Sequence, residues 1–333
     1  MHVHEADLVN SYRVAQFLYE SENVIEWLLD PSEPSMRFLT SRDLLTPEPS
    51  ERALGRLRKN LGDRGWAFEI LARQREKTWW ATKKTCYRPK FRSTIWQLQV
   101  LADLGLTKED VRIANAVEFW FDLHCAKDGG YSPEVESRRS HLCTTGNMVR
   151  SLIRMGYLSD ERVQSAIKWL VDQQLPDGGW DCFGRLNGTL DAWEAMSAFA
   201  EIPENRRTTE TRKAIEHGSE FFLRRRLLHE GAPSRRWLQL CYPWHYFYDA
   251  LVGLDFMARL GYGHDRRIDE ALSVVVSKRR PDGKWHLEGV PGTRAGKRYP
   301  VSPLKLETPK KPSKMITFLA LRVLGKVSER HSH

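Results

Sequence analysis

The chain has 333 residues, of which 41% are hydrophobic, so it can bury a large core and does not have the composition of a disordered protein. Its net charge of +9 is moderate and spread along the chain, which permits an anionic ligand but is a weak argument for nucleic acid, so we expect no nucleic-acid partner. No apolar run is long enough to span a membrane, and residues 1–17 lack the pattern of a secretory signal. The five cysteines are odd in number and widely spaced, which favours reduced thiols in the cytoplasm over a disulfide framework.

Two kinds of helix are predicted along the chain. Residues 20–50 indicate a divergent first helix pair. Amphipathic segments follow, such as "VRIANAVEFWFDLH", "ERVQSAIKWLVDQQ" and "RRIDEALSVVVSKR". They alternate with segments that are apolar almost all round, such as "STIWQLQVLADLGL", "CTTGNMVRSLIRMGY" and "WHYFYDALVGLDFMARLGY". Residues 287–312 are rich in Pro, Gly and Lys and predict a long exposed loop before the last helix.

The turns between these helices resemble one another. An aromatic residue ends each turn, at Trp79, Tyr131, Trp180 and Trp285, with a degenerate copy at Trp237. The spacing is about 50 residues, which is typical of a repeat architecture. Strand signals are scarce, so we expect an all-α protein. Apolar inner helices alternating with amphipathic outer helices predict a closed α/α toroid of about five to six helix pairs, formed by residues 1–333 as one domain; a solenoid of stacked pairs is the alternative.

The turns "LPDGGW" and "RPDGKW" resemble the QW motifs of the prenyltransferase and squalene-oxidase repeat superfamily. The segments "WLLDPSEPSMRFLTSRDLL", "CTTG", "GGWDC" and "FYDALVGLD" are most similar to its bacterial and archaeal terpene-cyclase-like proteins. This resemblance covers roughly residues 20–325 and implies an α/α toroid. It does not fix the reaction, because one fold can carry many chemistries.

The sequence departs from the active-site motifs of that superfamily. It lacks both the D-x-D-D motif of protonating cyclases and the D-D-x-x-D motif of metal-dependent terpene synthases. The D-x-C zinc motif of protein prenyltransferases is similar to "LDAW", where Asp191 is kept but Trp193 replaces the cysteine. The downstream histidine segment of that family resembles "PWHYFYDALVGL", which contains His245.

Four carboxylates lie near the predicted starts of inner helices. A protonating cyclase needs a carboxylic acid that stays neutral in an apolar pocket, and the candidates are Asp181, Asp191, Glu194 and Asp249. Asp191 and Glu194 are three residues apart, so we expect them on one helix face, where they can share a proton. The alternative is that these residues cap helix N-termini.

Aromatic and basic residues also precede the inner helices. Trp96, Trp193, Trp244 and Tyr248 are candidates for the lining of an isoprenoid cavity, with ordinary core packing as the alternative. Helix N-termini and arginine side chains suit a phosphate, diphosphate or carboxylate group. The predicted anion-binding residues are Arg138, Arg139, Arg235 and Arg236, and the alternative is that they are solvated loop residues.

Two cysteines and one histidine form a candidate zinc site. Cys143, Cys182 and His245 all fall near inner-helix starts, and two thiolates with one imidazole leave a fourth zinc position open for substrate. No local C-x-x-C or H-E-x-x-H motif accompanies them. The alternative is that the cysteines are small buried hydrophobic residues.

These observations lead to one functional hypothesis and two alternatives. We expect a cyclase- or prenyltransferase-like protein that binds an isoprenoid or other apolar ligand in the toroid, with or without a phosphate or diphosphate group. Peripheral contact with a membrane is compatible with such a ligand. The alternatives are a non-catalytic toroid that binds a ligand or a protein partner, and a carbohydrate-active α/α barrel.

Overall fold

The computed structural model describes residues 22–230, 235–290 and 306–328, in which the regular secondary structure is helical. Within these ranges there is no β-strand, only isolated β-bridges, which confirms the predicted all-α class. The mostly buried helices are α3 (Pro34–Asp43), α6 (Thr94–Asp103), α8 (Leu142–Arg154), α10 (Glu194–Phe199), α12 (Ala250–Leu260) and α14 (Lys314–Ser328). The remaining α-helices are α2 (Glu22–Leu28), α4 (Glu51–Lys59), α5 (Gly65–Leu71), α7 (Val111–His124), α9 (Glu161–Asp172), α11 (Thr209–Arg224) and α13 (Asp269–Ser277).

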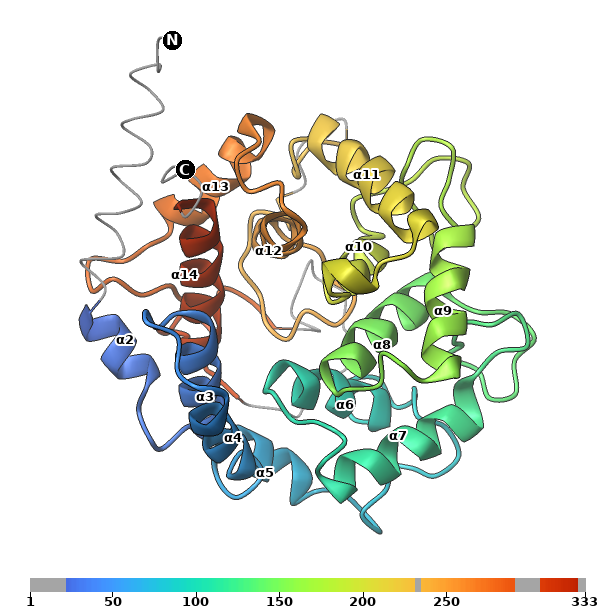
Figure 1. Ribbon diagram of the computed structural model, residues 1–333, viewed down its shortest axis with the longest axis horizontal. Coiled ribbons are helices and arrows are strands. Elements are labelled where there is room, and N and C mark those ends of the chain that lie inside the picture. Colours follow the sequence, from blue (N-terminus) through green and yellow to red (C-terminus); the bar gives the residue numbers. More distant parts are fainter. Residues whose placement is uncertain (1–21, 231–234, 291–305, 329–333) are drawn as a thin grey trace.

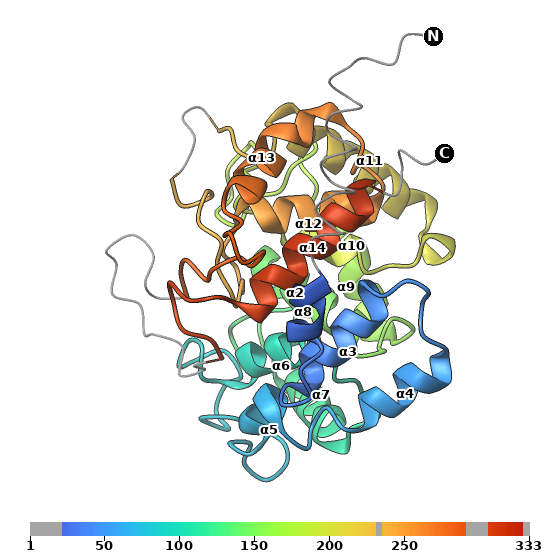
Figure 2. The same ribbon diagram turned by 90° about the vertical axis from the view of Figure 1, so that its left-hand side faces the viewer.

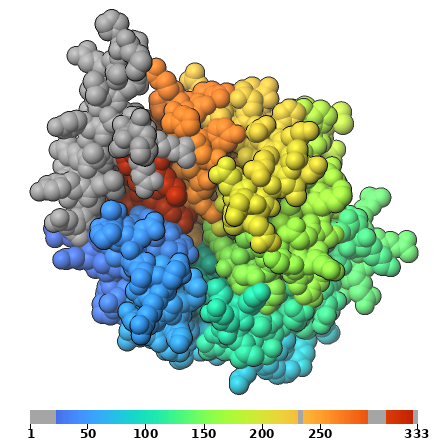
Figure 3. Space-filling model, viewed as in Figure 1, coloured from blue at the N-terminus to red at the C-terminus, as the bar shows by residue number. Residues whose placement is uncertain are grey.

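The two sets of helices form concentric layers. Figure 1 shows the mostly buried helices as an inner ring, with α2, α7, α9, α11 and α13 outside it. The ring closes where the last inner helix, α14, contacts the first, α3. In Figure 3 the segments follow one another round the face in chain order. The structure is therefore an α/α toroid rather than an open solenoid.

The predicted loop before α14 is described only at its ends. Residues 291–305 lie outside the described ranges, whereas residues 287–290 and 306–313 are described. The N–H of Leu287 donates to Lys311 O, and the N–H of Ser313 donates to Trp285 O. The two ends of the predicted loop therefore run side by side.

The aromatic residues of the repeated turns fasten the two layers together. The indole N–H of Trp80 donates to Ile70 O, that of Trp180 to Leu170 O, and that of Trp285 to Val275 O. Each bond runs from the turn back to the end of the preceding outer helix, and the indole is buried. The first copy of the repeat is therefore Trp80, and the prediction of Trp79 was wrong by one residue.

A glycine makes the tight turn before Trp180 possible. Gly178 has φ +91°, in the left-handed region that residues with a side chain rarely adopt. A Cβ atom at this position would lie 2.5 Å from His217 O of α11. The turn thus passes too close to the neighbouring outer helix for any other residue.

A ring of ion pairs joins the inner helices at their C-terminal ends. Arg322 of α14 bonds Asp255 of α12 at 2.6 Å and Asp43 of α3 at 3.2 Å. Glu201, just after α10, accepts from Arg154 of α8 at 2.6 Å and from Arg259 of α12 at 2.5 Å. Arg154 also pairs with Asp103 of α6, so every inner helix is part of the ring. The guanidinium groups also stabilise the negative ends of the helix dipoles.

The ring surrounds a cavity of about 530 Å³ that opens at the C-terminal end of the barrel. Figure 2 shows this end on the right, where α4 lies, and the connections that lead into α6 and α14 on the left. The neighbouring arginines lower the pKa of Asp43, to about 2, and the pKa values of Glu201 and Asp255 are also lowered. These carboxylates are therefore ionised and paired.

We predict that Glu201→Gln destabilises the protein by about 3 kcal/mol, because it removes the charge shared by Arg154 and Arg259, whose side chains are only 17% and 15% exposed. Urea unfolding measures this loss. The matched control is Glu118→Gln, which removes the exposed pair between Glu118 and Arg162 and should change the free energy of unfolding by less than about 1 kcal/mol. Equal effects of the two substitutions would contradict the structural role of the ring.

Candidate functional site

The strongest candidate site lies inside the barrel and is centred on Glu194, the first residue of α10. Its side chain is buried, and neither carboxylate oxygen has a hydrogen-bond partner among the described residues. Buried polar atoms are nearly always hydrogen-bonded, so two unpartnered oxygens on one carboxyl group indicate a place for water or a ligand. Glu194 was among the predicted catalytic residues.

Glu194 reaches this position because α10 approaches α8 very closely. A Cβ atom at Gly146 of α8 would lie 2.6 Å from Glu194 Cβ and 2.7 Å from its carbonyl carbon. Only glycine allows the two helices to come together here. The contact places Glu194 against the face of α8 that carries Cys143, Asn147 and Arg150.

Arg150 is a buried cation within this site. One of its amino nitrogens, Nη2, lies 3.7 Å from Asp103 of the C-terminal ring, whereas Nε and Nη1 have no hydrogen-bond partner among the described residues. Its guanidinium group lies over the rings of Trp193 and Trp244, at 5.4 and 5.9 Å from their centroids. Arg150 therefore links the paired charges at the end of the barrel to the unpaired polar atoms of the interior.

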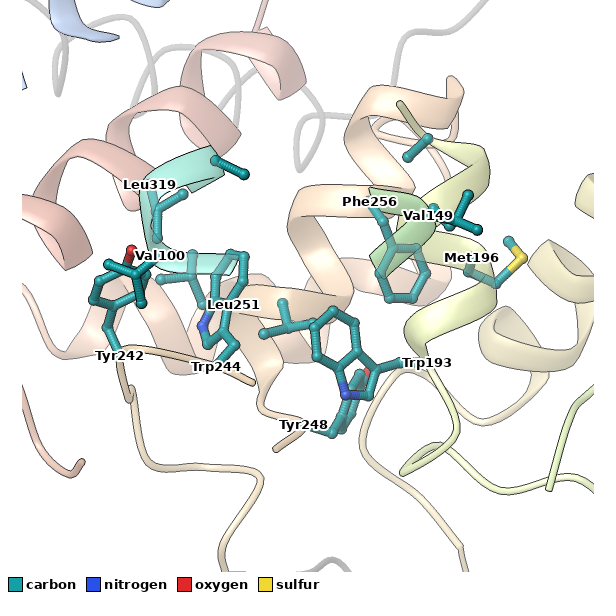
Figure 4. Packing of buried hydrophobic residues seen from close by; sticks show 14 of the residues in the cluster. Val100, Val149, Trp193, Met196, Tyr242, Trp244, Tyr248, Leu251, Phe256 and Leu319 are labelled. Carbon is teal, nitrogen blue, oxygen red and sulfur yellow. The ribbon is translucent and has the colours of Figure 1, made fainter. Parts of the chain in front are cut away.

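Two tryptophans supply the apolar surface beside Arg150. Trp193 and Trp244 pack edge to face with their centroids 6.2 Å apart, and the indole N–H groups lack partners within the described part of the chain. Figure 4 shows both indoles among apolar side chains of the inner helices, including Leu251 and Phe256. Both tryptophans were predicted to line the interior.

The other two predicted aromatic residues have hydrogen-bonded roles. Trp96 donates its indole N–H to Tyr87 O, and Tyr248 donates its hydroxyl to Leu227 O. Both side chains are buried. Their polar atoms thus hold connections in place rather than remaining open to a ligand.

His245 is a second buried group with an unpartnered atom. Its Nδ1 lies 2.9 Å from Gln99 Oε1, its ring stacks on Phe91 at 5.2 Å, and Nε2 has no partner among the described residues. Burial, with a smaller effect from the charge of Arg150, lowers the pKa of His245 to about 3, so the imidazole is neutral. If Nδ1 donates its proton to Gln99 Oε1, Nε2 carries a free lone pair.

The electrostatic surroundings of Glu194 favour its neutral form. Burial raises the pKa of Glu194 well above its usual range, and the nearby Cys143 and Asp191 raise it further. Arg150 and the backbone act in the opposite direction but are weaker. Glu194 is therefore a carboxylic acid held protonated in the interior, as a general acid at neutral pH requires.

The other three predicted carboxylates accept structural hydrogen bonds. Asp181 accepts from the N–H groups of Phe183 and Arg185, and Asp249 accepts from that of Val252 as the N-cap of α12. Asp191 accepts the indole N–H of Trp237 at 2.9 Å. The expectation that Asp191 and Glu194 share a helix face was wrong, because α10 begins only at Glu194.

The structure brings Cys143 and Cys182 together. The interaction of the two thiols lowers the pKa of Cys143 and raises that of Cys182. His245 is instead bonded to Gln99. In the part of the chain that the structure describes, no three His, Cys, Asp or Glu side chains are arranged to hold a metal ion. Zinc therefore stays a prediction.

The predicted anion-binding arginines are exposed. Arg138 and Arg139 lie in the connection before α8, and Arg235 and Arg236 lie before α12. The buried Arg322 and the partly buried Arg154 lie at the other end of the inner helices and are paired with carboxylates. A phosphate contact by the exposed arginines remains a prediction.

Sequence reasoning missed three polar residues of the interior: Gln99, Asn147 and Arg150. The segment of α8 was predicted to be apolar almost all round, yet Thr144, Asn147 and Arg150 are all buried. The signal that could have revealed them is the presence of polar residues in a segment that was predicted to be buried on all sides. A polar residue that is fully buried usually has a specific partner or role.

Comparisons with known proteins bear on the fold. No protein-family model matches the chain, and no curated protein matches it. Two solved structures of variants of the type II terpene cyclase MstE from Scytonema, one with geranylgeranyl dihydroxybenzoate (substrate) and one with merosterolic acid A (product), are similar with TM-scores of 0.51. Each is 12% identical, with 97% of this chain and 99% of the other covered.

A carbohydrate-active protein is equally similar in structure. The glycosyl hydrolase family 88 protein from Bacteroides vulgatus has a TM-score of 0.50 and 11% identity, with 96% of this chain and 99% of the other covered. The fold is an α/α toroid. At these identities the likeness shows the fold alone, so the reaction must be inferred from the site. None of the helices described is both long and apolar enough to cross a membrane.

We predict that Gly146→Ala destabilises the protein by about 1–3 kcal/mol, because its methyl group would overlap Glu194 and push α8 and α10 apart. The matched control is Gly55→Ala in α4, where nothing lies within 4 Å of the added carbon. This control should be neutral or stabilising by up to about 1 kcal/mol. Thermal and urea unfolding measure both changes, and a neutral Gly146→Ala would show that the close helix contact is wrong.

Proposed function

We propose that this chain is an acid catalyst that acts on an apolar, alkene-bearing isoprenoid in the interior of the toroid, with Glu194 as the proton donor. The observation that carries the proposal is the buried Glu194 carboxyl group, which has two unpartnered oxygens and a raised pKa. A neutral carboxylic acid can protonate a carbon–carbon double bond when water is excluded. The D-x-D-D motif of protonating cyclases is absent from this sequence. Glu194 would therefore supply the proton that this motif supplies in those enzymes.

The surroundings of Glu194 support the charge changes that such a reaction requires. Proton transfer leaves a carboxylate on Glu194 and a carbocation on the substrate. The guanidinium of Arg150, which lies over the rings of Trp193 and Trp244, would stabilise the carboxylate. The indole faces that Arg150 does not cover would stabilise the carbocation through cation–π attraction. The lone pair of His245 Nε2 offers an acceptor for the proton that is lost when the reaction ends.

The ligand class is inferred from the lining of the site. Indole rings and aliphatic side chains surround the polar atoms, which suits a chain of isoprene units. The type II terpene cyclase MstE, which shares the fold, has geranylgeranyl dihydroxybenzoate as its substrate. An anionic end group, if the ligand has one, would be held by the exposed arginines of the connections, such as Arg138 and Arg139.

The two alternatives have less support. A carbohydrate-active barrel would depend on Asp181, Asp191 and Asp249. Each of these carboxylates already accepts a hydrogen bond from an N–H group, and only Oδ1 of Asp181 is buried without a partner among the described residues. A non-catalytic toroid would use the same interior for binding alone. Binding alone does not explain why Glu194 is a neutral acid with both of its carboxylate oxygens unpartnered.

The proposal predicts isomerisation of a polyprenyl substrate with uptake of one solvent hydrogen. Geranylgeranyl dihydroxybenzoate incubated with the protein in D₂O should give a cyclised isomer that carries one deuterium, because Glu194 delivers a solvent-derived proton and another proton is lost at the end. Glu194→Gln should lower this rate by at least about 100-fold. Chromatography with mass spectrometry measures both product and label.

The control for this experiment is Glu109→Gln, which changes an exposed carboxylate and should keep the wild-type rate. Binding of the substrate, followed by tryptophan fluorescence, should persist in Glu194→Gln because the amide keeps the shape of the side chain. A Gln variant that cyclises at the wild-type rate would exclude Glu194 as the acid. Binding without turnover by the wild-type protein would favour the non-catalytic alternative.

A further inference from the structure

The cavity of about 530 Å³ at the C-terminal end of the barrel has cations in its wall that the ring of ion pairs does not use. The arginines of the wall that are paired with carboxylates are Arg42, Arg154, Arg259 and Arg322. Their partners are Asp43, Asp103, Glu201 and Asp255, so these charges balance. The wall also contains two further cations, Arg58 and Lys326, and one further carboxylate, Glu48.

Arg58 of α4 and Lys326 of α14 have no ion-pair partner among the described residues. The Nε atom of Arg58 is buried and has no hydrogen-bond partner in this part of the chain. Because buried donors are nearly always hydrogen-bonded, the open N–H of Arg58 indicates a place for an acceptor. Lys326 is exposed and lies one helical turn beyond Arg322.

The side chain of Arg58 is held against a rigid aromatic ring. Its guanidinium lies over Phe38, at 5.1 Å from the ring centroid, and that of Arg42 lies 5.4 Å from the same centroid. Phe38 is fully buried, and a Cβ atom at Gly105 would lie 2.8 Å from two of its ring carbons. Since these contacts already order Arg58, it loses little side-chain freedom when it binds a ligand.

The two unused cations reach the cavity from different helices. The inner helix α3 contacts both α4 and α14, and Figure 1 shows these three helices on the same side of the toroid. A ligand in the cavity can therefore be held from two directions. The negative helix ends and Glu48 disfavour an anion here, whereas Arg58 and Lys326 favour one.

We propose that this cavity binds a phosphate-bearing anion, with the guanidinium of Arg58 and the ammonium of Lys326 as its contacts. An arginine matches the geometry of phosphate oxygens, and a second cation suits a group with close to two negative charges. The cavity volume lies in the range of small-molecule sites. Glu194 does not line this cavity, so the proposal is independent of the isoprenoid chemistry.

The experiment is a calorimetric titration of the full-length protein with inorganic diphosphate at constant ionic strength. We expect one anion to bind per chain. Arg58→Gln should weaken binding by about 10-fold or more, because it removes a charge-assisted hydrogen bond. Lys326→Gln should weaken binding by a smaller factor because this ammonium is exposed. Glu48→Gln should tighten binding by about twofold or more, because it removes a like charge from the wall.

The source of the phosphate group is identified by parallel titrations with inorganic phosphate and with glucose 6-phosphate. Tighter binding of the sugar phosphate indicates that the site takes a phosphorylated metabolite. Equal or weaker binding of the sugar phosphate indicates that the site takes a free inorganic anion.

The matched control is Arg56→Gln, which changes an exposed arginine of α4 that does not line the cavity and should bind diphosphate as the wild type does. Glu194→Gln should also keep this affinity, which separates the anion site from the proposed acid catalysis. Circular dichroism establishes that each variant is folded. Absence of binding at millimolar diphosphate, or equal losses in Arg56→Gln and Arg58→Gln, would overturn the proposal.

Discussion

The closed ring of inner helices depends on charge sharing at their C-terminal ends. Arg154, Arg259 and Arg322 each contact carboxylates from more than one inner helix. Each ion is buried or nearly so, and a buried charge is tolerated only when it is paired. The ion pairs of the ring therefore determine which helices are neighbours. Apolar contacts alone would be less selective between possible neighbours.

The same ring determines where the interior site lies. Glu201 joins α8 to α12 directly after α10, so the short helix α10 is held at its C-terminal end. Gly146 then allows the first residue of α10 to pack against α8 at backbone distance. Glu194 is buried by these two constraints, and Arg150 reaches toward it from the charged ring. A carboxyl group in this position stays protonated because burial disfavours its charged form and Arg150 opposes this effect only weakly.

Local sequence patterns predicted the fold well. Helical periodicity and the repeated glycine-aromatic turns are local features, and together they indicated two layers and a closed toroid. The single error in the repeat, Trp79 for Trp80, arose because two tryptophans are adjacent and only three-dimensional contacts distinguish them.

The site was predictable only in part. Glu194, Trp193 and Trp244 were identified because they lie at the start of an inner helix. Asp181, Asp191 and Asp249 lie in similar sequence positions, and only the structure shows that each already accepts a hydrogen bond from an N–H group. Arg150 and Gln99 were missed because their partners, Asp103 and His245, come from other helices. Such long-range pairings leave no local signal.

The central claim is that Glu194 is neutral in the folded protein, and the pH dependence of stability tests it most directly. The folded chain keeps the Glu194 proton above pH 4.5, the ordinary pKa of a glutamate, where the unfolded chain releases it. This group therefore lowers the free energy of unfolding as pH rises, until the pH reaches its folded pKa. Glu194→Gln has no such proton, and the effects of titrating groups that do not interact with Glu194 cancel in the comparison.

The measurement is the difference in unfolding free energy between Glu194→Gln and the wild-type protein, from urea titrations between about pH 4 and pH 8. Our account predicts that the Gln variant gains stability relative to the wild type as pH rises, by up to about 1.4 kcal/mol per pH unit. A difference that stays constant over this range would show that Glu194 ionises in the folded protein as it does in the unfolded chain. That result would contradict the account of a buried, protonated acid.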